Sequence, residues 1–204
     1  MSITPEDFLR DVRDHKINIL LDSGIYRHIK FKRPDNHWNM WFDLVTWPGF
    51  LTIAADMGCW TFARLPDMFS FFRDSKLRIN ASYWAEKLQH GTHGGRDGAK
   101  VFSEELFKQR LVAQLTEYYD LEGDRLQSVM EALRDEVLCQ DCKLDLLIAA
   151  RDFKHDGFQF DTCELPDGKE YAYHLLWCLY AIVWGIQQYD AATRKAPTAE
   201  VAAQ

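Results

Sequence analysis

The chain has 204 residues, of which 47% are hydrophobic and 14% aromatic, and this composition is typical of a globular protein with a packed core. Its formal net charge of −7 argues against general binding to nucleic acid or to an anionic membrane, because both require a local basic surface. We therefore expect a single continuous core in one domain over residues 1–190, followed by a disordered tail at 191–204.

The N-terminal segment predicts a short helix and then a β-hairpin. Thr4 is expected to be the N-cap residue of the helix, with Asp7 three positions later as its capping partner. Two strands, at residues 17–21 and 25–33, are separated by a glycine-containing turn at residues 22–24.

Residues 41–73 predict three short strands and the beginning of a helix. Turn signals with glycine at residues 48–49 and 56–58 separate the strands. Together with the hairpin they predict an antiparallel meander of about five strands within residues 1–80. An aromatic helix that begins near Asp67 is expected to cover this sheet.

Residues 81–190 predict a mostly helical half, which makes the expected fold class α+β. Apolar residues recur at helical spacing in five segments, at residues 82–89, 103–119, 124–138, 142–153 and 170–189. A short strand is expected at residues 157–160, before the last of these helices. The last segment is apolar nearly all round, as expected of a helix buried in a core. Its longest apolar run, residues 175–186, is well short of the ~20 residues that a membrane span needs.

Five cysteines, an odd number, fit reduced thiols in a cytosol better than a secreted disulfide framework. The charged N-terminal segment lacks the apolar core of a secretory leader, and we expect a soluble cytoplasmic protein. Two of the cysteines form a Cys-x-x-Cys pair, a spacing found in zinc sites. The weak zinc candidates are Cys139, Cys142, His155 and Cys163, with His174 beyond them. Because the later spacings are irregular, buried structural roles are the alternative, and we expect no metal or other cofactor.

The sequence contains no recognisable catalytic motif. His28 could form an acid–base pair with Asp43 or Asp56, but no nucleophile accompanies them, and Asp56 lies where turns commonly place aspartate. The glycine-rich loop at residues 90–98 could bind an anion, yet it matches no phosphate-binding motif, and a surface linker is the alternative. Cys59 has no base near it in the sequence. His174 is expected to be a core histidine.

Negative charge is concentrated in residues 117–145, which contain nine acidic and three basic side chains. Carboxylates spaced along helices could occupy a nucleic-acid-binding groove on another protein, and an ordinary solvated face is the alternative. The residues predicted to form this contact surface are Glu117, Asp120, Glu131, Asp135 and Glu136.

Alternation along the second strand predicts one basic strip. Its outward residues are Tyr26, His28, Lys30 and Lys32, with Arg33 beside them. An exposed sheet face of this kind is similar to surfaces that contact phosphate or RNA. A solvated face is again the alternative, and the acidity of the chain argues against nucleic-acid binding.

The segment LTIAADMGCWTFARLPDMFSFFR, residues 51–73, resembles a block found in an uncharacterised family of small accessory proteins of tailed bacteriophages and prophages. The similarity extends from the N-terminal helix through residues 80–88, with a weaker match in the C-terminal tryptophan-rich helix. No activity is established for that family, so no catalytic residue carries over. The resemblance implies a protein made in the cytoplasm of an infected bacterium, with a host or defence-system protein or ribonucleoprotein complex as its partner, as for anti-CRISPR proteins.

These observations favour a non-enzymatic phage accessory protein that binds and modulates a host or bacterial-defence macromolecule. The contact surface would be the acidic residues of the helical half or the outer face of the sheet. One alternative is a nucleic-acid-binding protein that uses the basic strip. A second alternative is a small hydrolase that depends on a metal or on carboxylates. The sequence does not predict the oligomeric state.

Overall fold

The structure, a computed structural model, describes residues 3–35, 39–92 and 97–195. The chain divides into two compact units. Unit 1 consists of Met1–Ala99 and Tyr171–Gln204, and unit 2 of Lys100–Glu170. Each unit has its own hydrophobic cluster, so the expectation of one continuous core is wrong. The physical reason is that the apolar side chains between residues 100 and 170 pack mainly against one another.

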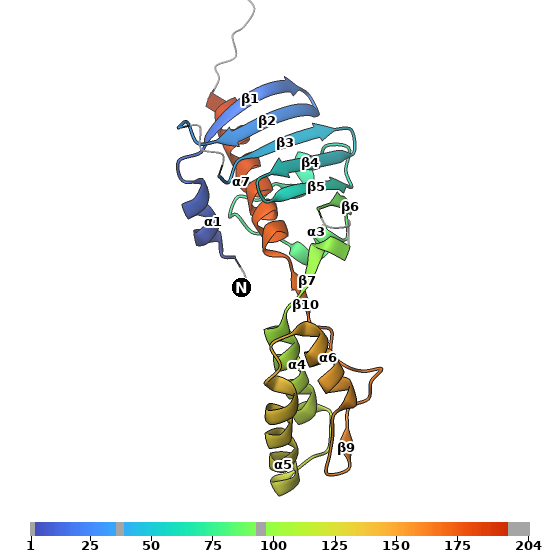
Figure 1. Cartoon of the computed structure of the whole chain (residues 1–204). Helices are drawn as coiled ribbons and strands as arrows, with labels where there is room; N and C mark the ends of the chain where they lie inside the picture. The colour runs from blue at the N-terminus through green and yellow to red at the C-terminus, as the bar shows by residue number, and fades with distance from the viewer. Residues whose placement is uncertain (1–2, 36–38, 93–96, 196–204) are drawn as a thin grey trace, which may run out of the picture. The chain divides into compact units, whose positions relative to one another are not determined.

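Unit 1 contains a six-stranded antiparallel sheet in which the strands follow the order of the chain (Figure 1). Its strands are β1 (Lys16–Ser23), β2 (Tyr26–Lys32), β3 (Phe42–Trp47), β4 (Phe50–Ala55), β5 (Gly58–Ala63) and β6 (Leu88–Gly91). The first five strands and the α+β class are confirmed.

The sixth strand lies where the sequence predicts a helix at residues 82–89. Helix α3 (Ala81–Ala85) is shorter than predicted, and Leu88 pairs with Phe62 of β5. Gly91, at the end of β6, makes the pairing sterically feasible, because a Cβ atom there would lie 2.3 Å from a ring carbon of Trp60. Cross-strand pairing therefore prevails over the helical spacing of the segment.

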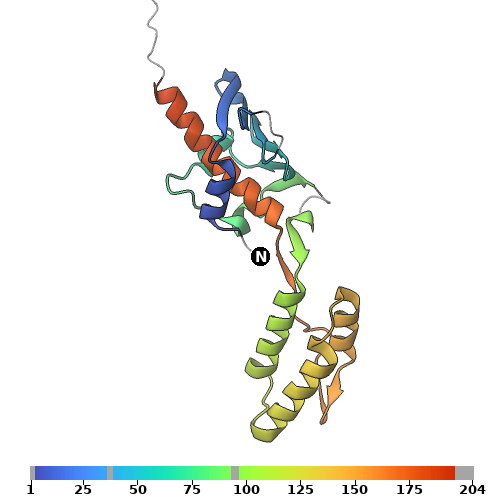
Figure 2. The same ribbon diagram turned by 60° about the vertical axis from the view of Figure 1, so that its left-hand side comes forward.

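Three helices of unit 1 pack against one face of the sheet, which we call the inner face. They are α1 (Pro5–Val12), α2 (Met68–Phe72) and α7 (Tyr173–Lys195), and the views in Figures 1 and 2 agree that α1 and α7 lie on the same side. The predicted capping box of α1 is confirmed, since Thr4 and Asp7 exchange hydrogen bonds. Helix α7 approaches the sheet closely at Gly185, where a Cβ atom would lie 2.7 Å from Leu44 Cδ1.

Unit 2 is mostly helical, and the chain enters and leaves it through the paired strands β7 (Lys100–Phe102) and β10 (Lys169–Tyr171). The elements that build its core lie between these two strands: α4 (Glu104–Glu117), α5 (Gly123–Leu133), the π-helical turn η2 (Arg134–Leu138), α6 (Lys143–Asp152) and the hairpin of β8 (Lys154–His155) and β9 (Phe158–Gln159). The 3₁₀ turn η1 (Asp97–Ala99) precedes β7. The four helical segments predicted within residues 103–189 are thus confirmed, with a π-helical ending on the second.

Helix α7 is buried mainly between Leu175 and Ile186, in agreement with the predicted buried final helix, but its limits differ from the expected 170–189. It begins at Tyr173 and continues to Lys195, so residues 191–195 of the expected tail are helical. Residues 196–204 lie outside the described part of the chain. None of the described helices combines the length and the apolarity that crossing a bilayer requires.

Candidate functional site

The acidic residues predicted to form a contact surface lie on unit 2 and are exposed. All nine carboxylates within residues 117–145 are exposed, and none of them forms an ion pair with another described residue: Glu117, Asp120, Glu122, Asp124, Glu131, Asp135, Glu136, Asp141 and Asp145. We call these nine side chains the acidic surface.

The charge is segregated between the two units. Unit 2 contains 17 acidic and nine basic side chains, a formal charge of −8. The remainder of the chain contains 14 acidic and 15 basic side chains, a formal charge of +1. Unit 2 therefore accounts for the acidity of the whole protein.

The packing of α5 and η2 explains why their carboxylates face solvent. Val129, Leu133 and Val137 recur every four residues and are completely buried in the core of unit 2. Glu131 and Asp135 alternate with them and consequently lie on the opposite face. The amide of Gln127 donates a hydrogen bond of 3.0 Å to Glu131, which is the contact that orients this carboxylate.

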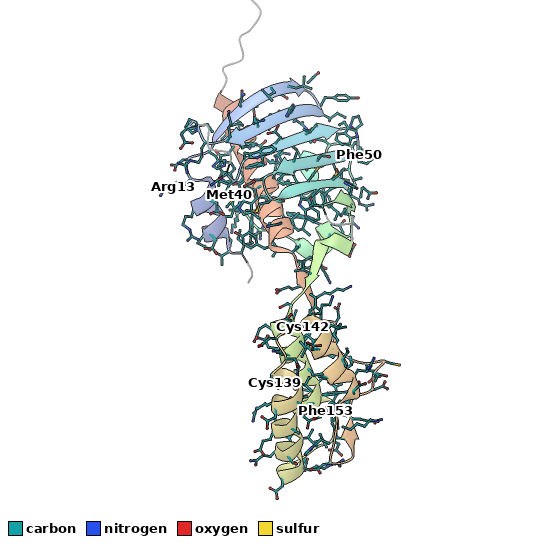
Figure 3. All side chains as sticks on the ribbon, viewed as in Figure 1. Arg13, Met40, Phe50, Cys139, Cys142 and Phe153 are labelled. Carbon is teal, nitrogen blue, oxygen red and sulfur yellow. The ribbon has the colours of Figure 1, made fainter. Side chains whose placement is uncertain are left out.

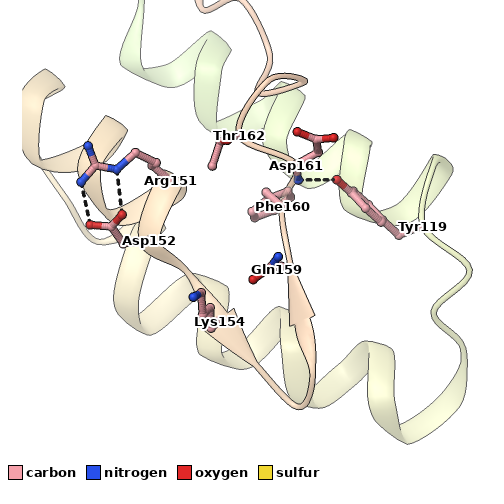
Figure 4. A pocket seen from close by; sticks show the side chains of 8 residues that line it. All are labelled: Tyr119, Arg151, Asp152, Lys154, Gln159, Phe160, Asp161 and Thr162. Atoms are coloured by element: carbon pink, nitrogen blue, oxygen red, sulfur yellow. Dashed lines mark hydrogen bonds and ion pairs between the residues drawn. The ribbon is translucent and has the colours of Figure 1, made fainter.

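An open groove of about 750 Å³ lies on unit 2, between the end of α6 and the segment that follows β9 (Figure 4). On one wall, the guanidinium of Arg151 donates two hydrogen bonds, of 2.7 and 2.8 Å, to the carboxylate of Asp152. On the other wall, the backbone N–H of Asp161 donates to the hydroxyl of Tyr119. The hydrogen bonds to Arg151 lower the pKa of Asp152, so this carboxylate is stabilised as an anion rather than prepared for proton transfer.

The predicted basic strip exists, and two of its side chains contact one carboxylate. Tyr26, His28, Lys30 and Lys32 alternate with the buried Arg27, Ile29 and Phe31 along β2, so they lie on the outer face of the sheet. The Nε2 atom of His28 is 2.8 Å from Asp43 Oδ2, and the Lys30 ammonium is 3.4 Å from the same carboxylate. The Lys30 ammonium also lies 5.4 Å from the centre of the Trp41 ring.

The pairing of His28 with Asp43 does not form a catalytic arrangement. The Asp43 side chain is 12% exposed and is shared between the His28 ring and the Lys30 ammonium, so it acts as the counterion of Lys30 and as a hydrogen-bond partner of His28. The hydroxyls of Thr52 and Thr61, on the same face, hydrogen-bond each other at 2.8 Å. Asp56, the other proposed partner, accepts a hydrogen bond from the backbone N–H of Met40 and has the turn role that was its alternative.

A serine, a histidine and an aspartate meet in unit 2, but not in the order of a catalytic relay. The Ser128 hydroxyl lies 3.0 Å from His155 Nε2 and 2.7 Å from Asp156 Oδ2. Asp156 is 3.6 Å from the same Nε2 atom, whereas a relay requires the carboxylate at the other ring nitrogen. Arg125 also donates to the backbone oxygen of Asp156. These contacts fasten the tip of the β8–β9 hairpin to α5.

The zinc candidates are not brought together. Cys139 and Cys142 lie at the turn between η2 and α6 (Figure 3), and both are exposed. His155 contacts Ser128, and Cys163 is an exposed thiol in the segment between β9 and β10. No group of three or more histidine, cysteine, aspartate or glutamate side chains with a metal-binding arrangement occurs among the residues described. The alternative of buried structural cysteines is also wrong for these three.

Three further candidates from the sequence are His174, Cys59 and the glycine-rich loop at residues 90–98. His174 is exposed near the start of α7, so the expectation of a core histidine is wrong. Cys59 is exposed on β5, where its backbone N–H donates to the Thr92 hydroxyl. Of the glycine-rich loop, His90 and Gly91 belong to β6, residues 97 and 98 belong to η1, and residues 93–96 lie outside the described residues.

Two aromatic residues of the outer face were missed by the sequence analysis. Trp47 and Phe50 flank the turn between β3 and β4, and their rings stack with centres 5.3 Å apart. Alternation along β4 places Phe50 on the face opposite Leu51 and Ile53, so the sequence contains a signal for its outward position. The groove of unit 2 had no comparable signal, because its lining residues come from separate segments.

His15 is a buried titratable group between α1 and β1. It is 7% exposed, its Nε2 atom lies 2.9 Å from the carbonyl oxygen of Met40, and its ring stacks on Phe42. Its Nδ1 atom has no hydrogen-bond partner among the described residues. Burial lowers the pKa of His15 below its ordinary value, because a charged imidazolium would be poorly solvated there.

The stability of unit 1 should therefore fall as the pH drops below about 6.5, since the unfolded chain then binds a proton that the folded His15 refuses. In His15→Gln, which keeps an N–H donor without titrating, the loss of unfolding free energy between about pH 7 and pH 5 should be smaller than in the wild type. Urea unfolding at several pH values measures this, with the exposed His174→Gln as the matched control. An identical pH dependence in His15→Gln and in the wild type would contradict the prediction.

Comparison with protein-family models, with curated proteins and with solved structures finds no match for this chain. Function must therefore be inferred from the chain's own residues.

Four described carboxylates have a pKa that differs from the ordinary value of aspartate. In each of them, hydrogen bonds or ion pairs lower the pKa: Asp7, Asp67, Asp74 and Asp152.

Proposed function

We propose that the chain is a non-enzymatic phage accessory protein that binds a basic surface of a host or defence-system macromolecule through the acidic surface of unit 2. The observation that carries the proposal is the segregation of charge, which places a formal −8 on unit 2 and +1 on the remainder. The phage context comes from the resemblance of residues 51–73. The mode of action, contact with another macromolecule, comes from the surface itself.

The acidic surface has the properties that such a contact requires. Its nine carboxylates are exposed, and no described cation neutralises any of them, so their charges remain available to a partner. A basic partner surface would be attracted to these exposed charges. Basic surfaces that bind nucleic acid are complementary to a dense array of anions, and they form the class of partner that we propose.

Exposed aromatic and aliphatic side chains accompany the carboxylates on unit 2. Tyr118 is 81% exposed and adjoins Glu117, while Leu144 and Ile148 are 63% and 41% exposed on α6. Leu144 and Ile148 are four residues apart and therefore lie on the same face of this helix. Charged groups determine the rate and the orientation of encounter, whereas apolar and aromatic side chains contribute much of the affinity at an interface.

Reversal of three charges tests the proposal. In the triple variant Glu131→Lys, Asp135→Lys, Glu136→Lys, recovery of the partner from bacterial lysate on the immobilised protein should fall at least about tenfold, which corresponds to about 1.4 kcal/mol of binding free energy. Partner recovery on the wild type should also decrease as salt is raised and when duplex DNA is added as a competitor for the basic surface. Quantitative mass spectrometry of the captured proteins measures each effect.

The matched control is Glu6→Lys, Glu105→Lys, Glu164→Lys, which changes the net charge by the same amount at exposed positions outside the acidic surface. This control should retain the partner as the wild type does. Equal recovery by the acidic-surface variant and the wild type would refute the proposal. Equal losses in both triple variants would refute it too, because only the net charge would then matter.

A further inference from the structure

The solvent face of the β8–β9 hairpin forms one side of the groove of unit 2. Lys154 of β8 pairs directly with Gln159 of β9, so their side chains lie on the same face of the hairpin. The next pair, His155 and Phe158, faces the opposite way, and Phe158 is buried in the core of unit 2. The Lys154 and Gln159 side chains therefore point away from that core and line the groove (Figure 4).

Two cations and one carboxylate lie on the wall formed by the end of α6 and the start of β8. Arg151 binds Asp152 through its Nε and Nη2 atoms, which leaves its Nη1 atom outside this pair. The charge of Lys154 helps to lower the pKa of Asp152, but the Lys154 ammonium forms no hydrogen bond or ion pair with a described residue. Positive charge therefore exceeds negative charge on this wall by one unit.

Neutral hydrogen-bonding groups accompany the two cations. The Gln159 amide and the Thr162 hydroxyl line the groove and are exposed, and neither side chain hydrogen-bonds to another described residue. The other carboxylate of the groove, that of Asp161, accepts a hydrogen bond of 2.8 Å from the backbone N–H of Cys163. Figure 4 shows this carboxylate pointing away from Gln159 and Lys154. The groove thus presents ammonium, guanidinium, amide and hydroxyl donors to a ligand.

Donors of these four kinds suit the oxygen atoms of a phosphate monoester. Such a group carries nearly two negative charges at neutral pH and three acceptor oxygens, whereas a carboxylate carries one charge and two oxygens. Guanidinium and ammonium groups both bind phosphate by charge-assisted hydrogen bonds. The groove volume of about 750 Å³ lies within the range of small-molecule sites, about 300–1,000 Å³, so it also has room for an organic part.

We propose that the groove of unit 2 binds a small organic phosphate, whose phosphate group is held by Lys154 and the free edge of Arg151. Gln159 and Thr162 donate to the remaining phosphate oxygens, and the half-buried Tyr119 adjoins the organic part from the other wall. The charge of −8 on unit 2 opposes the approach of an anion, but exposed charges are largely screened beyond about 8 Å at physiological salt. The adjacent cations therefore determine whether the phosphate binds.

Amide chemical shifts of the ¹⁵N-labelled protein test the proposal by titration with inorganic phosphate, ribose 5-phosphate and adenosine monophosphate. All three probes should shift amides within residues 151–162. Equal affinities would show that the phosphate alone is recognised, whereas tighter binding of adenosine monophosphate than of ribose 5-phosphate would show that the base also contributes. Adenosine, which lacks the phosphate, should bind at least about tenfold more weakly than adenosine monophosphate.

Substitutions in the groove test the role of single donors. Lys154→Gln should weaken binding of adenosine monophosphate about tenfold or more, the usual cost of one hydrogen bond to a charged group. Gln159→Leu removes a neutral donor and should weaken it about two- to tenfold. The matched control Lys108→Gln changes the net charge of unit 2 by the same amount on α4, outside the groove, and should retain the affinity. The amide spectrum of each variant also shows whether it is folded.

This proposal does not rest on the acidic surface, and the two are tested separately. The triple charge reversal of that surface should not weaken binding of adenosine monophosphate, and Lys154→Gln should not reduce recovery of the partner from lysate. Three results would overturn the proposal of a phosphate site: no shifts with any phosphate at about 10 mM, where even a Kd of about 1 mM gives near-saturation, equal affinities for adenosine and its monophosphate, or equal losses in Lys154→Gln and Lys108→Gln. Shifts confined to residues outside the groove would overturn it too.

Discussion

The substitution Asp67→Ala should lower the free energy of unfolding of unit 1 by about 3–5 kcal/mol, the usual cost of leaving a buried charge without its partner. The guanidinium of Arg27, whose side chain is 10% exposed, donates two hydrogen bonds of 2.9 and 3.1 Å to the Asp67 carboxylate. It also lies 4.5 Å from the centre of the Phe69 ring. Without Asp67, this cation would remain in the core with neither counterion nor sufficient water.

Asp67 has a second role that adds to the expected loss. As the N-cap residue of α2, it accepts a hydrogen bond of 3.0 Å from the backbone N–H of Phe69. Burial by itself would raise the pKa of Asp67, but the hydrogen bonds from Arg27 and Phe69 outweigh burial and lower it. The stabilisation is therefore complete above the unfolded pKa of an aspartate, about 3.9, and is lost as the pH falls through the lower folded value.

Urea unfolding followed by tryptophan fluorescence measures this effect selectively, because all seven tryptophans belong to unit 1. The control Asp152→Ala breaks the exposed ion pair with Arg151 and should change the free energy of unfolding far less than Asp67→Ala, because solvent screens the exposed pair. In a double-mutant cycle, Arg27→Met combined with Asp67→Ala should be less destabilising than the sum of the two single changes, since neither charge is then left alone. Additive losses would show that the two side chains are not coupled.

The substitution Phe158→Ala should cost about 3–5 kcal/mol, and the loss should be confined to unit 2. Phe158 is 6% exposed, and its ring centre lies 4.8 Å from that of Tyr119 and 5.0 Å from that of Phe160. These rings belong to the hydrophobic cluster of unit 2, which is distinct from that of unit 1. Removal of the ring would leave a cavity that the neighbouring aromatic side chains can fill only in part.

Two probes distinguish a loss of stability confined to unit 2 from one that extends to the whole chain. Unit 2 contains no tryptophan, so its helices are followed by far-ultraviolet circular dichroism and by amide hydrogen exchange. In Phe158→Ala, amide protection should fall within residues 104–152 while the tryptophan transition stays near that of the wild type. The exposed Tyr118→Ala is the control and should change stability by less than about 0.5 kcal/mol. A matching shift of the tryptophan transition would show that the units unfold together.

Much of unit 1 could be predicted because its signals are local. Glycine-containing turns separate strands of alternating polarity, and this is sufficient to assign β1–β5 and to place Arg27 inside and Tyr26 outside. The strand β6 could not be predicted in this way. Its first residue, Leu88, continues the helical spacing of the preceding segment, and only the pairing with β5, together with the close approach of Trp60 to Gly91, makes residues 88–91 a strand.

The acidic surface could be predicted from local sequence patterns, whereas the fate of the candidate zinc site depended on packing. Charge counts identified the acidic segment, and exposure in the structure agrees with that placement, because the buried Val129, Leu133 and Val137 direct their neighbours outward. The cysteine spacing suggested a zinc site, but the structure does not bring three or more of the candidate ligands together among the described residues. Sequence spacing constrains residues within one turn or helix, whereas a site assembled from several segments depends on how they pack.

The sequence by itself determined the α+β class, the positions of the first five strands along the chain, the buried final helix and the concentration of carboxylates between residues 117 and 145. Each of these depends on neighbouring residues and on their periodicity. The tertiary structure alone decided that there are two hydrophobic cores, that Asp43 contacts both His28 and Lys30, and that Tyr26 and Trp47 lie side by side. These features depend on contacts between segments far apart in the chain, which local patterns do not encode.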